Sequence, residues 1–267
     1  MKIGFIGAGN MGTALIKGYL AAHGNENRNL CVFDKDVEKV SALCAALGIR
    51  KCDSLEQLME ESDAAVLAVK PNIFDGIVPE ISRFYRPGQV LVSIAAGISM
   101  EYIEKLLNKE GAKIVRVMPN TPAMVNEGMS ALCRNRFVSD TEFESVMELF
   151  RSVGKAEVVQ EELIHTVIGV SGSSPAYTYL YIEALIDAAV ANGMDREQAK
   201  LFAGQSVLGA AKMVLETGID PATLRENVCS PGGTTIEAVN VLLSNGFQDN
   251  IKEGFNAAVT KSKIMTK

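Results

Sequence analysis

Tryptophan is absent from this sequence, and histidine occurs only twice, at His23 and His165. Without tryptophan the chain lacks the indole platform on which many proteins stack sugars or bases. The two histidines lie far apart and have no zinc-type spacing around them. We therefore expect no metal site and no catalytic histidine.

Cysteine is scarce and scattered along the chain. Cys31, Cys44, Cys52, Cys133 and Cys229 are odd in number, and none lies in a C-x-x-C pair. This pattern argues against a disulfide framework. We expect reduced, mostly buried thiols in a cytosolic protein. Cys229 adjoins a glycine-rich segment described below, but packing is its expected role.

Long apolar runs are missing as well, since no stretch reaches the length of a membrane span. The chain begins MKIGFIGAG, so a strand and a turn stand where a signal peptide would have its charged and apolar regions. The 267 residues are 48% hydrophobic with a net charge of −6, and no basic patch suggests nucleic acid. These features predict a soluble cytoplasmic protein with a full core, and no membrane or nucleic-acid partner.

Apolar strands alternate with helices in the first part of the chain. The expected strands are residues 2–8, 29–34, 63–69, 89–96 and 113–119, with 129–134 and 156–160 extending the sheet. The expected helices are 10–22, 37–47, 73–84, 100–107 and 141–152. Near-continuous apolar strands between helices indicate an α/β fold with a doubly wound, mostly parallel sheet of the Rossmann type. We assign residues 1–160 to this dinucleotide-binding domain.

The alternation of strands and helices ends near Glu161, and no segment after it has a convincing strand pattern. Helices are expected at 174–191, at 195–216, from Asp220-Pro221 onward, at 232–243 and at 249–263. Apolar residues cover more than one face of these helices, and a helix that is apolar on most sides must bury most sides. Residues 161–267 are therefore expected to form an all-α dimerisation domain whose helices interleave with those of a second subunit.

The segment Gly7-Ala8-Gly9-Asn10-Met11-Gly12 fits the pattern G-x-G-x-x-G. It follows an apolar strand and opens a helix, so it predicts a loop that holds a pyrophosphate at a helix N-terminus. The next strand ends at Asp34, whose carboxylate can accept the ribose hydroxyls of NAD and repel the 2′-phosphate of NADP. Lys35 would partly offset that repulsion, so the choice between NADH and NADPH stays open.

Further cofactor contacts are expected where the strands end, because open α/β sheets bind ligands at the carboxyl ends of their strands. The third strand ends in AVKP, the fourth in IAAG and the fifth in MPNTP. Lys70 is expected to lie near phosphate or ribose hydroxyls rather than to act as a base. The expected cofactor-binding residues are Ile6, Gly7, Ala8, Gly9, Asn10, Met11, Gly12, Asp34, Lys35, Ala68, Val69, Lys70, Pro71, Ile94, Ala95, Ala96, Gly97 and Asn120.

A second glycine-rich segment, SPGGTT at residues 230–235, precedes another apolar helix. Free N–H groups at a helix start can bind an anion such as a carboxylate. The alternative is an ordinary helix start capped by Ser230.

Over essentially its whole length the chain resembles the Δ1-pyrroline-5-carboxylate reductases. The motifs that carry the resemblance are GFIGAGNMG, AVKP, AAG, MPNTP, GVSGSSPAY and NVCSPGGTTIEAV. The resemblance implies a Rossmann domain, a helical domain that forms an intertwined homodimer, and often further association into a ring of dimers, a decamer. It also implies the reaction, in which hydride passes from NADPH or NADH to the C=N carbon of pyrroline-5-carboxylate and yields L-proline, the last step of proline biosynthesis.

The resemblance also implies roles for single residues. Thr235 would be catalytic and hydrogen bond the ring nitrogen, and Glu161 would be an acid beside the substrate. The full implied substrate-binding set is Glu161, Gly172, Ser173, Pro175, Asn227, Gly232, Gly233, Thr234 and Thr235. One departure is Asp34, since members that favour NADPH tend to carry a small polar or basic residue there.

The chemistry agrees with these residues, because a cyclic imine can arrive protonated and needs chiefly positioning against the nicotinamide. Two other functions were weighed. A β-hydroxyacid dehydrogenase needs a lysine on the first long helix after the sheet, and residues 174–191 contain none. A non-catalytic nucleotide-sensing protein would have no use for a second anion-binding segment.

Overall fold

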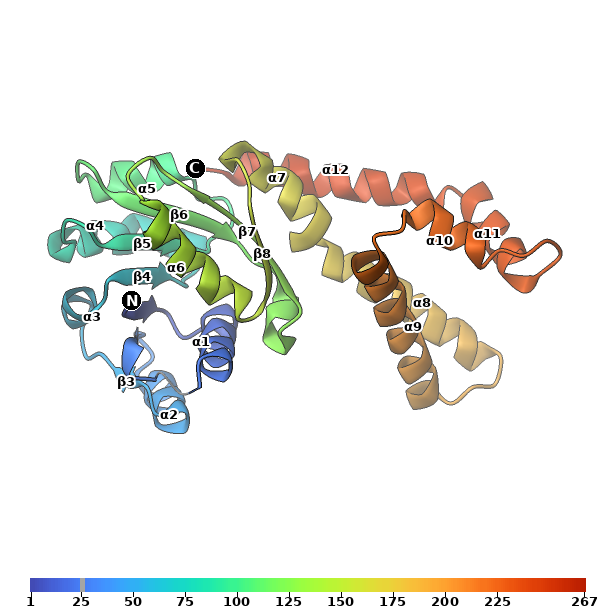
Figure 1. Cartoon of the computed structure of the whole chain (residues 1–267), viewed down its shortest axis with the longest axis horizontal. Coiled ribbons are helices and arrows are strands. Elements are labelled where there is room, and N and C mark those ends of the chain that lie inside the picture. Colours follow the sequence, from blue (N-terminus) through green and yellow to red (C-terminus); the bar gives the residue numbers. More distant parts are fainter. Residues whose placement is uncertain (25–26) are drawn as a thin grey trace. The chain divides into compact units, whose positions relative to one another are not determined.

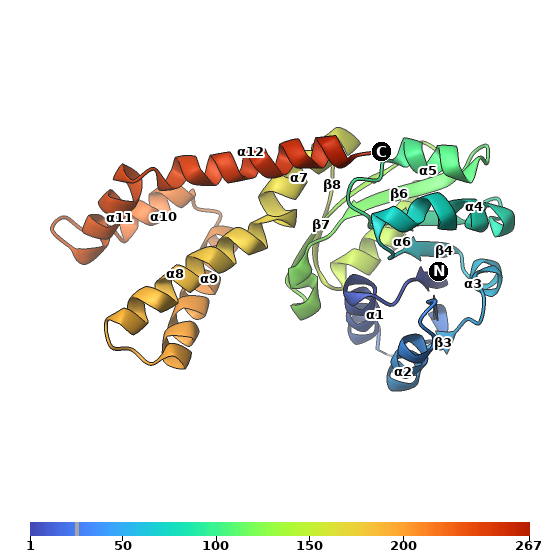
Figure 2. The ribbon, with the colours of Figure 1, turned by 180° about the vertical axis from the view of Figure 1, so that it is seen from behind.

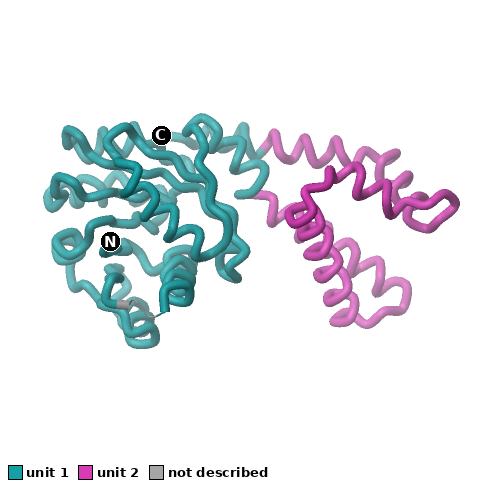
Figure 3. Tube along the Cα trace, viewed as in Figure 1, with its two compact units in different colours: residues 1–172, 258–267 teal, residues 173–257 magenta. Residues whose placement is uncertain are grey.

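The computed structural model describes residues 1–24 and 27–267, which divide into two compact units. Unit 1 comprises residues 1–172 and 258–267, and unit 2 comprises residues 173–257 (Figure 3). From the sequence we expected a division into 1–160 and 161–267. The contacts group residues 161–172 and the last ten residues with the sheet instead, and Ile164 lies in the core beneath it.

The described part of unit 1 is built on an eight-stranded sheet (Figure 1). Its strand order is β3-β2-β1-β4-β5-β6-β7-β8. Within it the β6–β7 pair is antiparallel and the other neighbours are parallel, which confirms the predicted mostly parallel, doubly wound sheet. The strands are β1 (Ile3–Ile6), β2 (Leu30–Phe33), β3 (Arg50–Lys51), β4 (Ala64–Leu67), β5 (Val90–Ser93), β6 (Lys113–Met118), β7 (Gly128–Arg134) and β8 (Gly154–Val158).

Helices cover both faces of this sheet, which is why the inner strands are apolar throughout. One core layer packs under α1, α2 and α6 around Leu15, Val40 and Phe143. The other packs under α3, α4 and α5 around Leu58 and Phe74, the face turned forward in Figure 2. The helices of unit 1 are α1 (Asn10–Ala22), α2 (Val37–Leu47), α3 (Leu55–Glu61), α4 (Phe74–Phe84), α5 (Met100–Leu107), α6 (Asp140–Arg151) and α7 (Ile164–Val167).

Strand β3 and helix α3 of unit 1 were not predicted. Strand β3 has only two residues, both charged, and it pairs along the edge of the sheet with β2. Helix α3 follows it and begins at Ser54, whose hydroxyl accepts a hydrogen bond from the Gln57 N–H. Strand β3 is too short to show an apolar period, whereas α3 carries a start signal that we overlooked, since Ser54 and Gln57 have capping-box spacing.

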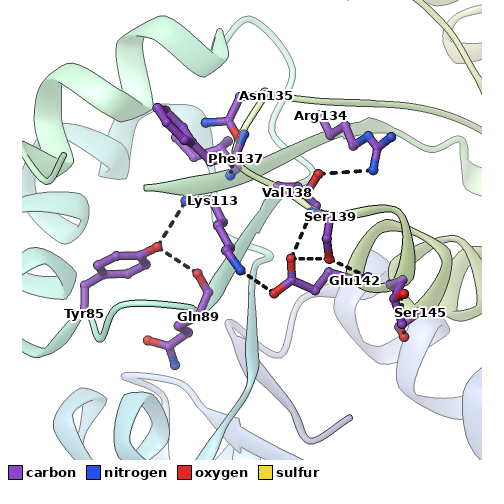
Figure 4. Close-up of polar contacts among 12 residues, drawn as sticks. Tyr85, Gln89, Lys113, Arg134, Asn135, Phe137, Val138, Ser139, Glu142 and Ser145 are labelled. Carbon is purple, nitrogen blue, oxygen red and sulfur yellow. Dashed lines mark hydrogen bonds and ion pairs between the residues drawn. The ribbon is translucent and has the colours of Figure 1, made fainter. Parts of the chain in front are cut away.

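A polar network fixes the start of α6 against the sheet (Figure 4). Ser139 and Glu142 form a capping box, in which each side chain accepts a hydrogen bond from the backbone N–H of the other residue. The Lys113 ammonium on β6 donates to Glu142. The Tyr85 hydroxyl accepts from the Lys113 N–H at 3.1 Å and donates to the Gln89 carbonyl at 2.8 Å. The network joins α4, β6 and α6 at one edge of the core.

The described residues of unit 2 are helical, as predicted. The helices are α8 (Ser174–Ala191), α9 (Arg196–Thr217), α10 (Pro221–Asn227), α11 (Thr234–Ser244) and α12 (Phe247–Met265), the last continuing into unit 1. Unit 2 has a small core around Ile186, Ala199 and Ala203. Among the described helices, none combines the length and apolar character needed to cross a bilayer.

Candidate functional site

The loop between β1 and α1 requires glycine at two of its predicted positions. Gly7 has a φ of +106°, and a Cβ there would lie 2.6 Å from the Ala68 carbonyl oxygen. A Cβ at Gly12 would lie 2.8 Å from the Gly7 carbonyl oxygen. The absence of side chains lets the ends of β1 and β4 approach the start of α1 closely. At Gly9, by contrast, a Cβ would have no neighbour nearer than the Ala68 carbonyl oxygen at 3.9 Å, so this part of the loop is open to a ligand.

Helix α1 starts with free backbone donors. Its N-cap is Gly9, and no side chain among the described residues caps it. The first turn also holds no acidic residue that would repel an anion. Unpaired N–H groups and the positive end of the helix dipole suit a phosphate. The glycine-rich loop therefore fits the pyrophosphate of a dinucleotide.

Asp34 is tied to this loop through its carboxylate. Its Oδ2 accepts a hydrogen bond from the Ala8 N–H at 2.6 Å, and its Oδ1 accepts from the Asp36 N–H at 3.0 Å. The neighbouring Phe33 carbonyl accepts from the Gly7 N–H at 2.8 Å. The end of β2 is thus fixed beside the glycine-rich loop, where a ribose would lie.

A pocket of about 320 Å³ opens at the carboxyl ends of β1, β2 and β4. It brings together eight of the predicted cofactor residues, namely Ile6, Gly7, Gly9, Asp34, Lys35, Ala68, Val69 and Lys70. A smaller pocket of about 160 Å³ includes Ala8 and Asn10. Met11, Gly12 and Pro71 line neither pocket, although Gly12 shapes the loop as described above.

Sequence reasoning missed four residues that line the larger pocket, namely Phe33, Lys39, Ile73 and Ile77. Lys39 lines both pockets and carries a second positive charge near Asp34. Its position in the first turn of α2, four residues after Lys35, was a usable signal. The apolar residues Ile73 and Ile77 gave no such signal, because core packing explains them equally well.

The segment Ile94–Gly97 after β5 lies outside both pockets. Gly97 has a φ of +73°, and its carbonyl accepts the Lys267 N–H at 3.0 Å. A Cβ at Gly97 would lie 3.1 Å from the Met265 carbonyl oxygen. The structure therefore shows this loop packed against the chain end, and its contact with the cofactor stays a prediction.

Asn120 is buried and uses both ends of its amide within unit 1. Its Nδ2 donates to the Ser171 carbonyl at 3.1 Å, and its Oδ1 accepts from the Met129 N–H at 2.8 Å. Nearby, a Cβ at Gly172 would lie 3.0 Å from the Met118 Cε. These contacts hold the MPNTP segment beside the predicted loop residue Gly172. A direct cofactor contact of Asn120 stays a prediction.

Glu161 lies in a charged, largely enclosed environment. Its Oε1 accepts from the Arg116 guanidinium and from the Met100 N–H, both at 2.8 Å. The Arg116 side chain is only 3% exposed, so Glu161 balances a buried charge. This pairing is a structural role that the sequence pattern did not reveal. The implied contact of Glu161 with substrate stays a prediction.

In unit 2, the SPGGTT segment forms a tight turn into α11. The Gly233 N–H donates to the Ser230 carbonyl at 3.0 Å, and Gly232 has a φ of +70°. Gly233 is the N-cap of α11, and no side chain in the described parts of the chain caps it. Ser230 is therefore not an ordinary cap. Thr234 and Thr235 are exposed in the first turn.

The other predicted substrate residues of unit 2 stand at helix ends. Ser173 is the N-cap of α8, without a side-chain cap bond among the described residues, and Pro175 lies in the first turn. Asn227 is the last residue of α10. Ser173 lies at the junction between the π-helical segment Ile168–Gly172 and α8, and Asn227 lies where α10 ends.

Models of two protein families match the chain. Residues 161–265 match the pyrroline-5-carboxylate reductase dimerisation family. Residues 2–97 match the family described as NADP oxidoreductase, coenzyme F420-dependent.

Curated relatives and solved structures match over the full length. The pyrroline-5-carboxylate reductase of Escherichia coli is 44% identical, with 100% of this chain and 98% of the relative covered. That of Methanosarcina acetivorans is 39% identical over the same shares. A pyrroline-5-carboxylate reductase structure from Coxiella burnetii has a TM-score of 0.93 at 35% identity, and a Plasmodium falciparum pyrroline carboxylate reductase with NADP bound has 0.89 at 34%. Both alignments cover 100% of this chain and 98% of the other.

Proposed function

The chain belongs to the pyrroline-5-carboxylate reductase family, and from that premise we propose which of its residues bind the cofactor and which bind the substrate. It is an NAD(P)H-dependent oxidoreductase that reduces pyrroline-5-carboxylate to L-proline, the last step of proline biosynthesis. The proposal concerns which residues hold the cofactor and the substrate, and what each of them does.

We assign the cofactor to the glycine-rich loop and the pocket beside it. The uncapped start of α1 would receive the pyrophosphate, and Asp34 with Lys35 and Lys39 would face the adenosine ribose. The observation that supports this assignment is the uncapped start of α1 beside a pocket lined by Gly7, Gly9 and Asp34. When bound, NAD(P)H supplies the hydride.

We assign the substrate carboxylate to the SPGGTT segment. The uncapped N–H groups of α11 offer an anion site that needs no arginine or lysine. The exposed Thr235 hydroxyl would accept a hydrogen bond from the protonated ring nitrogen and orient the C=N bond. Gly172, Ser173, Pro175 and Asn227 would complete the substrate site. The uncapped start of α11 is the single observation that carries this assignment.

With these assignments, reduction of the imine needs no strong acid from the protein. The imine can arrive protonated, so the residues chiefly bind, orient and exclude water. A β-hydroxyacid dehydrogenase would need a lysine on α8, which runs from Ser174 to Ala191 and has none. The residues of α8 therefore favour an imine reductase over a β-hydroxyacid dehydrogenase.

The homodimer is part of the proposal. Unit 2 leaves large apolar side chains exposed, including Leu180 at 67% and Leu201 at 70%. A pocket of about 690 Å³ within this unit is lined largely by apolar residues of α8, α11 and α12. Apolar surface on this scale favours cover by a second copy of the chain. Two further properties remain predictions from the sequence: the association of dimers into a decamer and a cytoplasmic localisation.

Thr235→Ala tests the substrate assignment. The loss of one hydrogen bond to a charged group costs about 1.5–3 kcal/mol, so kcat/KM for pyrroline-5-carboxylate should fall about tenfold to a hundredfold. The Kd for NADPH should stay unchanged. Thr235→Ser should restore much of the activity, and Thr260→Ala, at an exposed threonine of α12, serves as the control. Kinetics of Thr235→Ala equal to the parent would remove Thr235 from the mechanism.

A further inference from the structure

Three ligand-type side chains that lie far apart in the sequence meet at the edge of the sheet. Cys31 lies on β2, Cys52 directly follows β3, and Glu61 ends α3. Their sulfur and carboxylate oxygen atoms all lie within 4.8 Å of one another. The Cys52 N–H donates to the Val32 carbonyl at 2.8 Å, which fixes its backbone beside β2.

The two thiols are buried, with Cys31 3% and Cys52 1% exposed. Packing alone would explain two buried cysteines, since a free cysteine behaves as a small apolar residue. The carboxylate of Glu61 accompanies them, and on its outer side it forms an ion pair with the Arg50 guanidinium. The cluster therefore combines two thiols with a charged oxygen ligand, whereas packing alone would need only apolar side chains.

The Glu61 carboxylate is incompletely satisfied. Its Oε1 accepts a hydrogen bond from the Gln57 amide at 3.2 Å. Its Oε2 is buried and has no hydrogen-bond partner among the described residues, although the Arg50 guanidinium lies beside it as an ion pair. The Glu61 carboxylate therefore keeps acceptor capacity on the side of the two thiols.

We propose that Cys31, Cys52 and Glu61 form a binding site for a soft divalent cation of the zinc class. Two thiolates and a carboxylate are ligands that zinc accepts, and the fourth position of its tetrahedron would be left to water. The ion and the Arg50 guanidinium together neutralise the three negative ligands. Binding displaces the two thiol protons to solvent.

An entry path exists on the outer side of the cluster. The Arg50 side chain is 50% exposed and that of Glu61 is 26% exposed, so the carboxylate side faces solvent. Neither cysteine nor Glu61 lines the cofactor pockets. The site is therefore separate from the residues assigned to cofactor and substrate, and its test does not depend on that assignment.

Cobalt(II) added to the reduced, chelator-treated full chain tests the proposal. We expect one equivalent to produce the intense thiolate-to-metal charge-transfer absorption of a two-cysteine site. Cys31→Ser and Cys52→Ser should lose this band, and Glu61→Gln should weaken cobalt binding about tenfold or more. Cys44→Ser is the matched control, because Cys44 is also buried in unit 1 but lies outside the cluster. No band in the parent chain, or an undiminished band in Cys31→Ser, would overturn the proposal.

Thiol mapping of the unsubstituted chain covers the case in which a cysteine variant fails to fold. Under native conditions, without denaturant, zinc should slow alkylation of Cys31 and Cys52 at least tenfold more than alkylation of Cys44 and Cys133, because only the first two thiols would be bound to the metal. Equal rates with and without zinc at all four thiols would contradict the site. Slowing of Cys44 and Cys133 as strongly as of Cys31 and Cys52 under native conditions, without denaturant, would contradict it too, because these two thiols lie outside the cluster.

Discussion

The carboxylate of Asp34 accepts a hydrogen bond from the backbone N–H of Ala8 across 2.6 Å, so the end of β2 and the glycine-rich loop are joined directly. Lys35 and Lys39 line the same pocket. With Lys70, one negative and three positive side chains line this pocket, where we propose that the adenosine ribose binds. We therefore expect the balance of these charges to set the preference between the two cofactors.

Replacing Lys39 by alanine should reduce the use of NADPH more than that of NADH. An ammonium paired with an exposed 2′-phosphate is worth up to about 1 kcal/mol, so the NADPH/NADH ratio of kcat/KM should fall about fivefold. Asp34→Ser should shift the ratio in the opposite direction. Lys155→Ala, at an exposed lysine of β8, is the control. A ratio that is unchanged in Lys39→Ala would exclude Lys39 from cofactor selection.

Replacing Glu161 by glutamine should destabilise the fold. The Arg116 guanidinium would stay buried without its counter-charge, which costs about 3–5 kcal/mol. Urea denaturation measures this loss, with the exposed neighbour Glu162→Gln as the matched control. A stability loss below about 1 kcal/mol would show that the ion pair is not needed. The implied substrate contact predicts in addition a raised KM for pyrroline-5-carboxylate in the folded variant.

His165 should titrate below its ordinary value of 6.5. Burial, followed by the nearby positive charges of Arg116 and Lys263, lowers the pKa of His165. Since the chain holds only two histidines, the proton NMR titration of each is readily resolved. A midpoint for His165 at or above 6.5 would contradict the structure.

The same shift predicts a pH dependence of stability. A histidine with a lowered folded pKa binds its proton more readily in the unfolded chain, so protonation favours unfolding. Its contribution is complete above pH 6.5 and is lost as the pH falls below that value. The free energy of unfolding of His165→Gln should therefore decrease less between pH 7 and pH 5 than that of the parent. Parallel pH profiles would contradict this contribution.

A charge at the exposed apolar surface of unit 2 should disrupt the proposed dimer. Leu180 is 67% exposed and lines the apolar pocket of this unit. Leu180→Glu should shift the sedimentation coefficient of the protein toward that of a monomer. Lys200→Glu, at an exposed polar position of α9, should leave it unchanged. If Leu180→Glu sediments like the parent, the dimer does not form through this surface.

Local patterns predicted most of the fold. The apolar strands β1, β4 and β5 and the long helix α8 are each defined by residues that are close in sequence. The same holds for the glycine-rich loop, where φ and close approach depend on consecutive residues. Such features are readable because their cause lies within one short segment.

Contacts between distant segments were not predictable. The Arg116–Glu161 pair spans 45 residues, and the cluster of Cys31, Cys52 and Glu61 spans three elements. The expectation of no metal site was based on spacing along the chain, which says nothing about residues that the sheet brings together. These contacts depend on which strands are neighbours in the sheet. The pattern of a single sequence does not show which strands are neighbours, so it does not predict which distant residues meet.

Steady-state kinetics of the purified chain test the proposed reaction most directly. One assay follows the oxidation of NADPH or NADH with pyrroline-5-carboxylate as the substrate. The other follows the reduction of NADP⁺ or NAD⁺ with 3-hydroxyacids as the substrates. We expect saturable turnover with the imine, formation of L-proline in equal amount to the cofactor oxidised, and no turnover with the hydroxyacids. A folded, cofactor-binding protein that fails to reduce the imine would contradict the account.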